Sequence, residues 1–376
     1  MNFEDIRPYH DEEVPEKVRQ LLKAEQFREI IQKIYPQLPF DKFEAKLLSI
    51  QNISQFQKEI IVPILDKLLK NSSEGLDFRG IENIEKGKAY LFVSTHRDIV
   101  LDSALMNYIL MQEGFETAEI AIGDNLMTIP WVVDLVKLNK SFIVKRDVRK
   151  EEKVRASIEL SNYINHTIQK ENKSIWIAQR SGRSKDGDDR TNQSLIKMFN
   201  LAGTSEIALD NLQALNICPI AVSYEYNPCD ILTIPELIKK EKGEKYEKAP
   251  LEDMQHMAKG IEGTKGRIVV SFGKPISDQL EALKVLKSRK EIFNGIVRLI
   301  DEQIHQNYFL MPTNYIAHDL LNGKSEFSDK YSEAEKEEFK KYMTARLKEV
   351  EGDSDLIQHT FLKMYANPVD NQLAKA

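Results

Sequence analysis

Short runs of β-branched and aliphatic residues alternate with helical stretches between residues 88 and about 275. Apolar runs bounded by turn residues are typical of buried strands, and their alternation with helices is typical of parallel sheets. The pattern therefore predicts an α/β fold with a largely parallel sheet flanked by helices. The predicted strands are residues 89–93, 119–122, 141–144, 174–178, 219–223 and 267–272.

Helical patterns precede this core. Apolar residues recur at helical spacing from Phe56 to Leu69, although Pro63 should kink or split that helix. Residues 71–75 have the composition of a loop and of a domain boundary. We therefore predict an N-terminal helical region over residues 1–75.

The second half of the chain contains an insertion and a helical end. Residues 227–266 are rich in Lys and Glu and flanked by proline, which predicts a solvated loop or a flap over the site. Ser332 and Glu335 form a capping box that opens a charged helix from about 332 to 350. We predict one domain over 76–310 and a C-terminal helical extension over 311–376.

Composition narrows the functional classes only slightly. The chain has 376 residues, of which 41% are hydrophobic and 30% charged, and a formal net charge of -6. This charge gives no net attraction to nucleic acid, and none is predicted as a partner. The chain has only two cysteines, and its start is acidic and lacks an apolar core, which favours a cytoplasmic protein. It has no apolar stretch of roughly 18 to 20 residues, so we expect that it does not span a bilayer.

His96 is the first candidate for chemistry. It lies where a predicted strand ends and a helix begins, the edge at which α/β sheets bind ligands. Asp98 and Asp102 share one face of that helix, so either carboxylate could orient the imidazole to take a proton from a hydroxyl. Alternatively, His96 caps the helix or bonds a carbonyl. The letters His-Arg-Asp also open a kinase catalytic loop, but Ser103 occupies the position where a kinase requires Asn.

Further polar groups follow the next predicted strands. Lys145 and Arg146 end the strand at 141–144, and a basic, glycine-containing loop follows the strand at 174–178. An Arg fork can grip phosphate, and glycine permits close backbone approach, so three strand ends suit one anionic substrate. Pro219 lies in a buried-strand pattern that by itself indicates core. The substrate-binding candidates are Arg97, Lys145, Arg146, Arg180, Ser181, Gly182, Arg183, Ser184 and Pro219.

In this order, over about residues 78 to 275, the four segments resemble the motif blocks of the glycerolipid acyltransferase family. The resemblance implies that His96 is a general base, that Arg146 and Arg183 anchor an anionic lipid precursor, and that Pro219 supports a substrate pocket. It also implies acyl-CoA or acyl-carrier protein as the acyl donor, no bound cofactor, and no metal. The predicted function is transfer of a fatty acyl group to the hydroxyl of a glycerol-phosphate-type lipid precursor.

Two positions depart from the family pattern. The family places four residues between His and Asp, which here ends on Leu101, so Asp102 is the first choice of partner and Asp98 the second. Ser181 stands where the third block has Glu. The missing carboxylate leaves two alternatives: acylation of an amino-acid lipid, and a catalytically silent lipid-binding protein. A thioester hydrolase that uses the same base on water is a third.

A membrane-facing element is a separate question. Residues 126–136, including Trp131, form an apolar stretch that is either a surface helix suited to the inner face of the cell membrane or an ordinary core helix.

Overall fold

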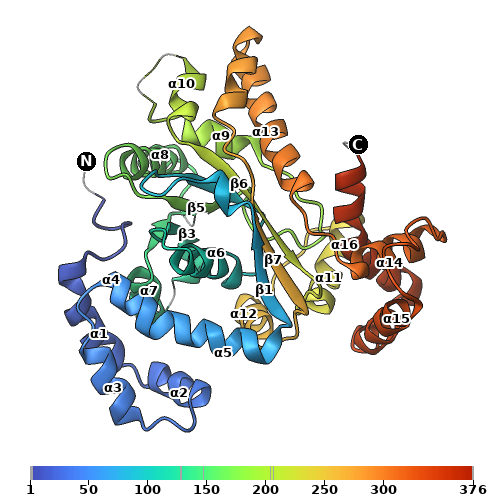
Figure 1. The fold of residues 1–376 in the computed structure, drawn as a ribbon, viewed down its shortest axis with the longest axis horizontal. Helices are drawn as coiled ribbons and strands as arrows, with labels where there is room; N and C mark the ends of the chain where they lie inside the picture. The colour runs from blue at the N-terminus through green and yellow to red at the C-terminus, as the bar shows by residue number, and fades with distance from the viewer. Residues whose placement is uncertain (1–2, 128, 147, 204, 206, 375–376) are drawn as a thin grey trace.

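A central sheet of seven strands runs through the computed structural model, which describes residues 3–127, 129–146, 148–203, 205 and 207–374 (Figure 1). Its strand order is β1-β7-β6-β2-β5-β3-β4. The strands are β1 (Gly75–Arg79), β2 (Leu91–Ser94), β3 (Glu119–Gly123), β4 (Ser141–Val144), β5 (Ile175–Ala178), β6 (Ile217–Tyr224) and β7 (Arg267–Phe272).

The sheet is largely parallel, as predicted. Every neighbouring pair runs parallel except β6 and β7. The six predicted strands are confirmed within a few residues, but β1 was wrongly assigned in part to a loop. The edge strand β1 is mostly exposed, so it lacks the apolar run that marks a buried strand. Because β2 to β6 are parallel, their carboxyl ends meet at one edge.

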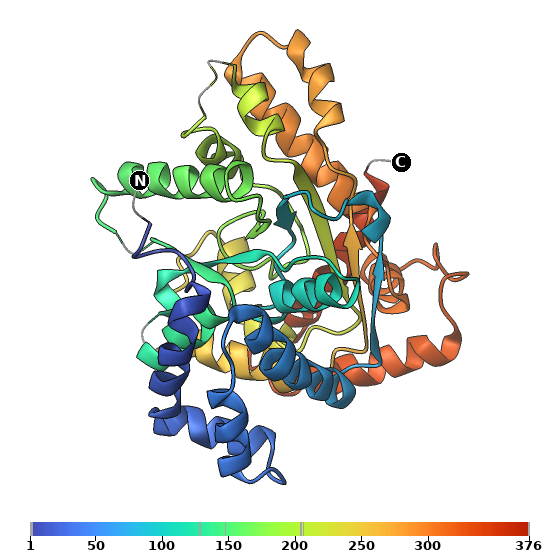
Figure 2. The same cartoon turned by 60° about the vertical axis from the view of Figure 1, so that its left-hand side comes forward.

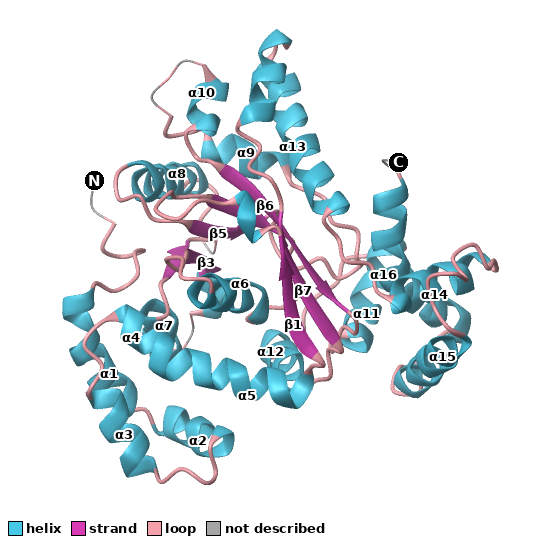
Figure 3. Cartoon of the chain, in the orientation of Figure 1, coloured by secondary structure: helices cyan, strands magenta, loops and turns pink. Residues whose placement is uncertain are grey.

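Helices cover both faces of the sheet, as Figure 3 shows. Alternate residues of β2 separate the two faces: Leu91 and Val93 join the core under α8, α9, α10 and α13, whereas Phe92 joins the core under α5 and α6. Period-two alternation thus explains how one strand serves two cores. The bounds of these helices are α5 (Val62–Ser72), α6 (Leu101–Gln112), α8 (Lys153–Gln169), α9 (Gln193–Phe199), α10 (Ala208–Gln213) and α13 (Arg289–Gln306).

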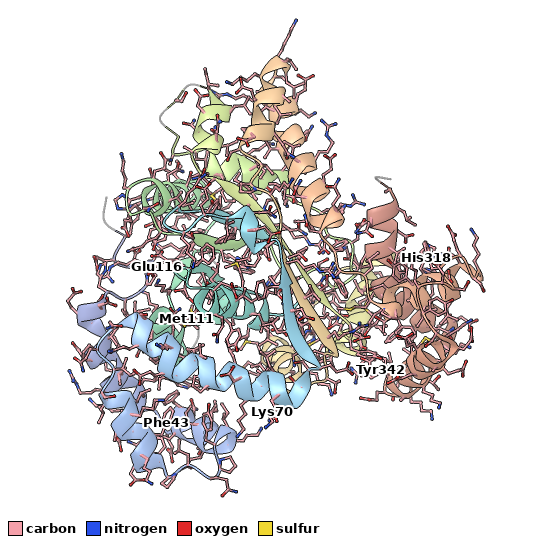
Figure 4. The ribbon with its side chains drawn as sticks, viewed as in Figure 1. Phe43, Lys70, Met111, Glu116, His318 and Tyr342 are labelled. Atoms are coloured by element: carbon pink, nitrogen blue, oxygen red, sulfur yellow. The ribbon has the colours of Figure 1, made fainter. Side chains whose placement is uncertain are left out.

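The terminal helices lie on opposite sides of the sheet in both views (Figures 1 and 2). Figure 4 labels Phe43 among the N-terminal helices, and His318 and Tyr342 among the C-terminal ones. The helix around Pro63 is not split: Ile53–Phe56 continues through a π-helical turn, Gln57–Ile61, into α5, and Pro63 stands in the first turn of α5. The remaining terminal helices are α1 (Val14–Leu22), α2 (Glu25–Ile34), α3 (Phe40–Leu48), α4 (Ile53–Phe56), α14 (Pro312–Asn322), α15 (Glu333–Leu347) and α16 (Ser354–Leu373).

The helix α7 (Pro130–Leu138) is half-buried: Lys137 and Leu138 are buried, and one side of the helix packs against the N-terminal helices. Trp131 and Leu135 pack against the N-terminal helices, and the Trp131 indole N–H donates to Gln26 Oε1 at 2.9 Å. In the part of the chain that the structure describes, no helix is long and apolar enough to cross a membrane.

The insertion at 227–266 is largely helical, so the expectation of a solvated loop was wrong. It contains α11 (Asp230–Glu241) and α12 (Glu252–Glu262). Ile231 and Ile234 of α11 pack into the C-terminal core while its lysines face outward, which explains why the composition resembled a loop. The α12 helix does cover the site: a Cβ on Gly260 would lie 2.1 Å from Asp98 Oδ2, so only glycine permits this approach.

Candidate active site

His96 and Asp102 form a pair at the carboxyl edge of the sheet. His96 lies in the 95–100 loop between β2 and α6, and Asp102 lies in the first turn of α6. His96 Nδ1 is 3.1 Å from Asp102 Oδ2, and the imidazole ring meets the Trp176 ring edge to face at 5.7 Å. The side chain of Asp102 is fully buried, whereas that of His96 is 18% exposed. The pair therefore has one sheltered carboxylate and one accessible base.

Both oxygens of Asp102 are held by other groups. Oδ2 also accepts the backbone N–H groups of Arg97 at 2.6 Å and Asp98 at 3.0 Å. Oδ1 accepts the Tyr224 hydroxyl at 2.8 Å, and burial next to this carboxylate raises the pKa of Tyr224 well above its usual value. A buried carboxylate needs such donors, and here they also fix its orientation toward His96.

Asp98, the second choice of partner for His96, has another role. Its Oδ1 accepts the backbone N–H groups of Val100 and Leu101, each at 2.8 Å, at the start of α6. Burial and the nearby Asp102 carboxylate raise the pKa of Asp98. The geometry thus assigns Asp98 to the helix terminus, and Asp102 alone of the two contacts the imidazole.

The 179–192 loop, which follows β5, is hydrogen-bonded to the loop of His96. The Ser184 N–H donates to the His96 carbonyl at 2.7 Å, although the buried Ser184 Oγ has no partner among the described residues. Arg180 pairs with Asp186 of the same loop at 3.4 Å. Ser181 and Gly182 are exposed. The His96–Asp102 geometry is therefore formed without a carboxylate at position 181.

Arg183 points toward α12 rather than into solvent. Its guanidinium donates to Nδ1 of His256, a residue that is 3% exposed. Burial and the charge of Arg183 lower the pKa of His256 to about 4, so this histidine is neutral near pH 7. The predicted anion anchor is thus held by the helix that covers the site.

Arg97 links the two loops through a buried carboxylate. Its Nη2 donates to Asp189 Oδ2 at 2.6 Å, and the Tyr308 hydroxyl donates to the same oxygen at 2.6 Å. Asp189 is fully buried. Since an Arg fork has five N–H donors, Arg97 keeps donors for a second partner.

The two cations after β4 lie farther along the edge. Strands β5 and β3 separate β4 from β2. Lys145 is engaged by Asp5 at 2.5 Å and Glu159 at 2.9 Å, whereas the backbone N–H of Arg146 donates to Asp124 at 3.0 Å. Lys145 is therefore placed as a link between elements, and Arg146 is exposed at the outer strand.

Pro219 lies inside the sheet. It is buried in β6 next to Val93 of β2, and its carbonyl accepts the Gly273 N–H at 2.8 Å. The residue of β6 that reaches the pair is Tyr224, five positions later. Sequence reasoning missed Tyr224 because one tyrosine at a strand end carries no distinctive signal, and it missed Asp189 because this carboxylate lies in an otherwise solvated-looking loop.

A cavity of about 60 Å³ lies beside the loop of His96 and beside Tyr224, the tyrosine that contacts Asp102. Arg97, Asp98 and Tyr224 line it on one side, and residues of the C-terminal helices, such as Asn314 and Tyr365, line the other. Among the described residues, no cluster of three or more His, Cys, Asp or Glu side chains is arranged to hold a metal ion.

The last helix braces the 179–192 loop as well. Gly187 has φ +74°, and a Cβ there would lie 2.3 Å from the Met364 carbonyl oxygen of α16. From α16, Asn367 donates to the Asp186 carbonyl at 2.6 Å, and Asn371 accepts from Arg190 at 2.8 Å. The C-terminal helices are therefore part of the site's support.

Residues 75–223 match the acyltransferase family model. This part of the chain is an acyltransferase domain. The match begins at the first residue of β1 and ends within β6, so it includes the His96–Asp102 pair and the 179–192 loop. It confirms the family resemblance and makes the chain an enzyme of acyltransferase type.

A crystal structure of the 1-acyl-sn-glycerophosphate (LPA) acyltransferase PlsC from Thermotoga maritima is similar at 14% identity, over 76% of this chain and 91% of that one. The TM-score of the two structures is 0.35. No curated protein sequence matches the chain.

Proposed function

We propose that this acyltransferase domain transfers a fatty acyl group from an acyl thioester, either acyl-CoA or acyl-carrier protein, to the hydroxyl of a glycerol-phosphate-type lipid precursor. The observation that carries the proposal is the contact of His96 Nδ1 with the buried Asp102 carboxylate. Such a contact fixes the tautomer with the proton on Nδ1 and leaves Nε2 as the base. Nε2 has no hydrogen-bond partner among the described residues.

The chemistry proceeds by one addition and one elimination. His96 Nε2 takes the proton of the acceptor hydroxyl while its oxygen attacks the thioester carbonyl, forming a C–O bond. Asp102 stabilises the imidazolium, and Tyr224 with two backbone N–H groups holds Asp102 in place. The C–S bond then breaks, and the imidazolium returns its proton to the leaving thiolate. The products are the ester and the free thiol.

The acceptor and the location are part of the proposal. We expect an anionic lipid precursor because cationic side chains, including Arg97 and Lys185, line the cavity beside the pair. A precursor with an acyl chain would be met at a membrane surface, which we propose to be the inner face of the cell membrane, with the protein otherwise in the cytoplasm. No cofactor or metal is required by this sequence of steps.

The test is transfer of labelled acyl groups by the purified full chain. Acyl-CoA and acyl-carrier protein would be offered with a panel containing glycerol 3-phosphate, lysophosphatidate and an amino-acid lipid. We expect transfer to a phosphorylated acceptor, and loss of about 10²- to 10⁴-fold in His96→Ala. His359→Ala, at an exposed histidine of α16, is the matched control and should keep full activity.

Other outcomes identify the alternatives. Transfer only to the amino-acid lipid would replace the acceptor but keep the mechanism. Release of free fatty acid without an acylated product would indicate a thioester hydrolase. Absence of both reactions in a folded protein that binds liposomes would indicate a silent lipid-binding protein, which the serine at position 181 favours. Unchanged transfer in His96→Ala would refute the general base.

A further inference from the structure

The cavity beside the His96–Asp102 pair is closed by a part of the chain that the family match does not include. The match ends at residue 223. Residues after that point form most of the lining: Tyr224, Asn227, Pro228, Lys265, Tyr308, Phe309, Leu310, Asn314, Met364, Tyr365 and Pro368. Figure 1 shows α14 and α16 beside the sheet, on the side of β6 and β7. This wall is therefore built mostly by residues outside the family match.

The cavity is continuous with the catalytic groups. Tyr224 lines it and donates its hydroxyl to Asp102, which in turn contacts His96. Arg97 and Asp98, the two residues after His96, also line it. A group held in the cavity would thus lie beside the loop that carries the base, rather than at a separate surface.

Three cations and one carboxyl group lie in the lining. Arg97 and Lys185 are each paired with one carboxylate, Asp189 and Glu236 respectively. Lys265 is 1% exposed, and none of the ion pairs formed by the described residues includes it. Its Nζ donates instead to Ser72 Oγ at 2.9 Å and to two backbone carbonyls.

The charge of Lys265 is therefore not neutralised by direct contact. Burial lowers its pKa to about 8, so the side chain is still mostly protonated near pH 7. The single carboxyl group of the lining, Asp98, has a raised pKa through burial and the charge of Asp102. Lys265 therefore brings to the lining a positive charge that no carboxylate contacts directly, and its burial reduces the screening of that charge by water.

The size of the cavity limits its occupant. Its volume of about 60 Å³ is several times the roughly 10–15 Å³ that one water requires by the same measure. This space is large enough for a phosphate-sized group. Arg97 and the Lys185 ammonium each keep N–H donors for such a group, since each has one carboxylate partner. The three N–H donors of Lys265 are already bonded to Ser72 and two backbone carbonyls, so Lys265 acts through its charge.

We propose that this cavity binds the phosphate group of the acceptor, with Arg97 and Lys185 as direct donors and the buried Lys265 as a positioning charge. This inference rests on the proposed function, and it assigns the acceptor's head group to a wall built by residues 224–376. It differs from the sequence-based expectation, in which Arg146 and Arg183 anchor the phosphate.

The experiment measures binding and catalysis in the same full-chain variants. Glycerol 3-phosphate, inorganic phosphate and glycerol are titrated by calorimetry into the wild type, Lys185→Met, Lys265→Met and the control Lys259→Met, an exposed lysine of α12. We expect both phosphate compounds to bind and glycerol not to bind. Loss of one charge should weaken phosphate binding roughly tenfold or more in each cavity variant, and not in Lys259→Met.

Transfer kinetics supply the second readout. The KM for a phosphorylated acceptor should rise in Lys185→Met and Lys265→Met, while the KM for the acyl donor stays unchanged. Unchanged phosphate affinity in folded Lys185→Met, or a rise only in the donor KM, overturns the proposal. His96→Ala separates the two proposals, since it should reduce transfer about 10²- to 10⁴-fold and keep phosphate binding. Phosphate binding by a wild type that transfers no acyl group would refute the proposed function and leave the cavity assignment standing.

Discussion

The buried contact between His256 and Arg183 makes the stability of this protein depend on pH. His256 is neutral, accepts a hydrogen bond from Arg183, and also faces Lys185, Glu252 and Asp253. Burial and the nearby cations lower its pKa from 6.5 to about 4. Between these values the unfolded chain binds a proton at this position and the folded chain does not. Stability is therefore fully present above pH 6.5 and is lost as the pH falls toward 4.

The magnitude follows from the two pKa values. Linkage gives a loss of about 2 kcal/mol of unfolding free energy between pH 7 and pH 5 from this single group. His256→Gln keeps an acceptor for Arg183 but cannot titrate, so its stability should fall by about 2 kcal/mol less over the same interval. Other groups that titrate in this range contribute equally to both proteins and cancel.

Urea unfolding at several pH values, followed by tryptophan fluorescence, measures this difference. His359→Gln, at an exposed position of α16, is the matched control and should follow the wild type. Parallel pH dependences for the wild type and His256→Gln would refute the argument, because they would show that the folded and unfolded chains protonate His256 alike.

Two further predictions concern single residues. In thermal unfolding, Gly187→Ala should destabilise the protein by several kcal/mol more than Gly182→Ala. Both glycines have a positive φ, near +74° and +78°, but only a Cβ at Gly187 would meet a backbone carbonyl, that of Met364. Equal losses of stability in the two variants would contradict this reasoning. Lys145→Gln should leave the KM for the acceptor unchanged, since two carboxylates already hold this side chain. These part-exposed ion pairs should contribute at most about 1 kcal/mol to stability. A raised KM for the acceptor would show that Lys145 contacts the substrate.

The sequence determined the elements whose signal is local. Six of the seven strands carry apolar runs that a buried strand requires, so their positions could be predicted within a few residues. The same reasoning located the loop of His96, because a histidine at a strand end is visible in the order of residues. The edge strand β1 and helices α11 and α12 were missed, since their exposed faces give them the composition of loops.

Tertiary structure decided which groups meet. The choice between Asp98 and Asp102 depends on how the 95–100 loop folds back on α6, and one turn of helix separates the two outcomes. Tyr224 contacts Asp102 although 122 positions separate them along the chain. Asp189 contacts Arg97 although 92 positions separate them. Such contacts are set by sheet order and by the docking of the C-terminal helices, which depend on packing across the whole molecule. The sequence therefore located His96 and indicated the family, whereas the fold alone determined which groups contact the imidazole and which line the cavity beside it.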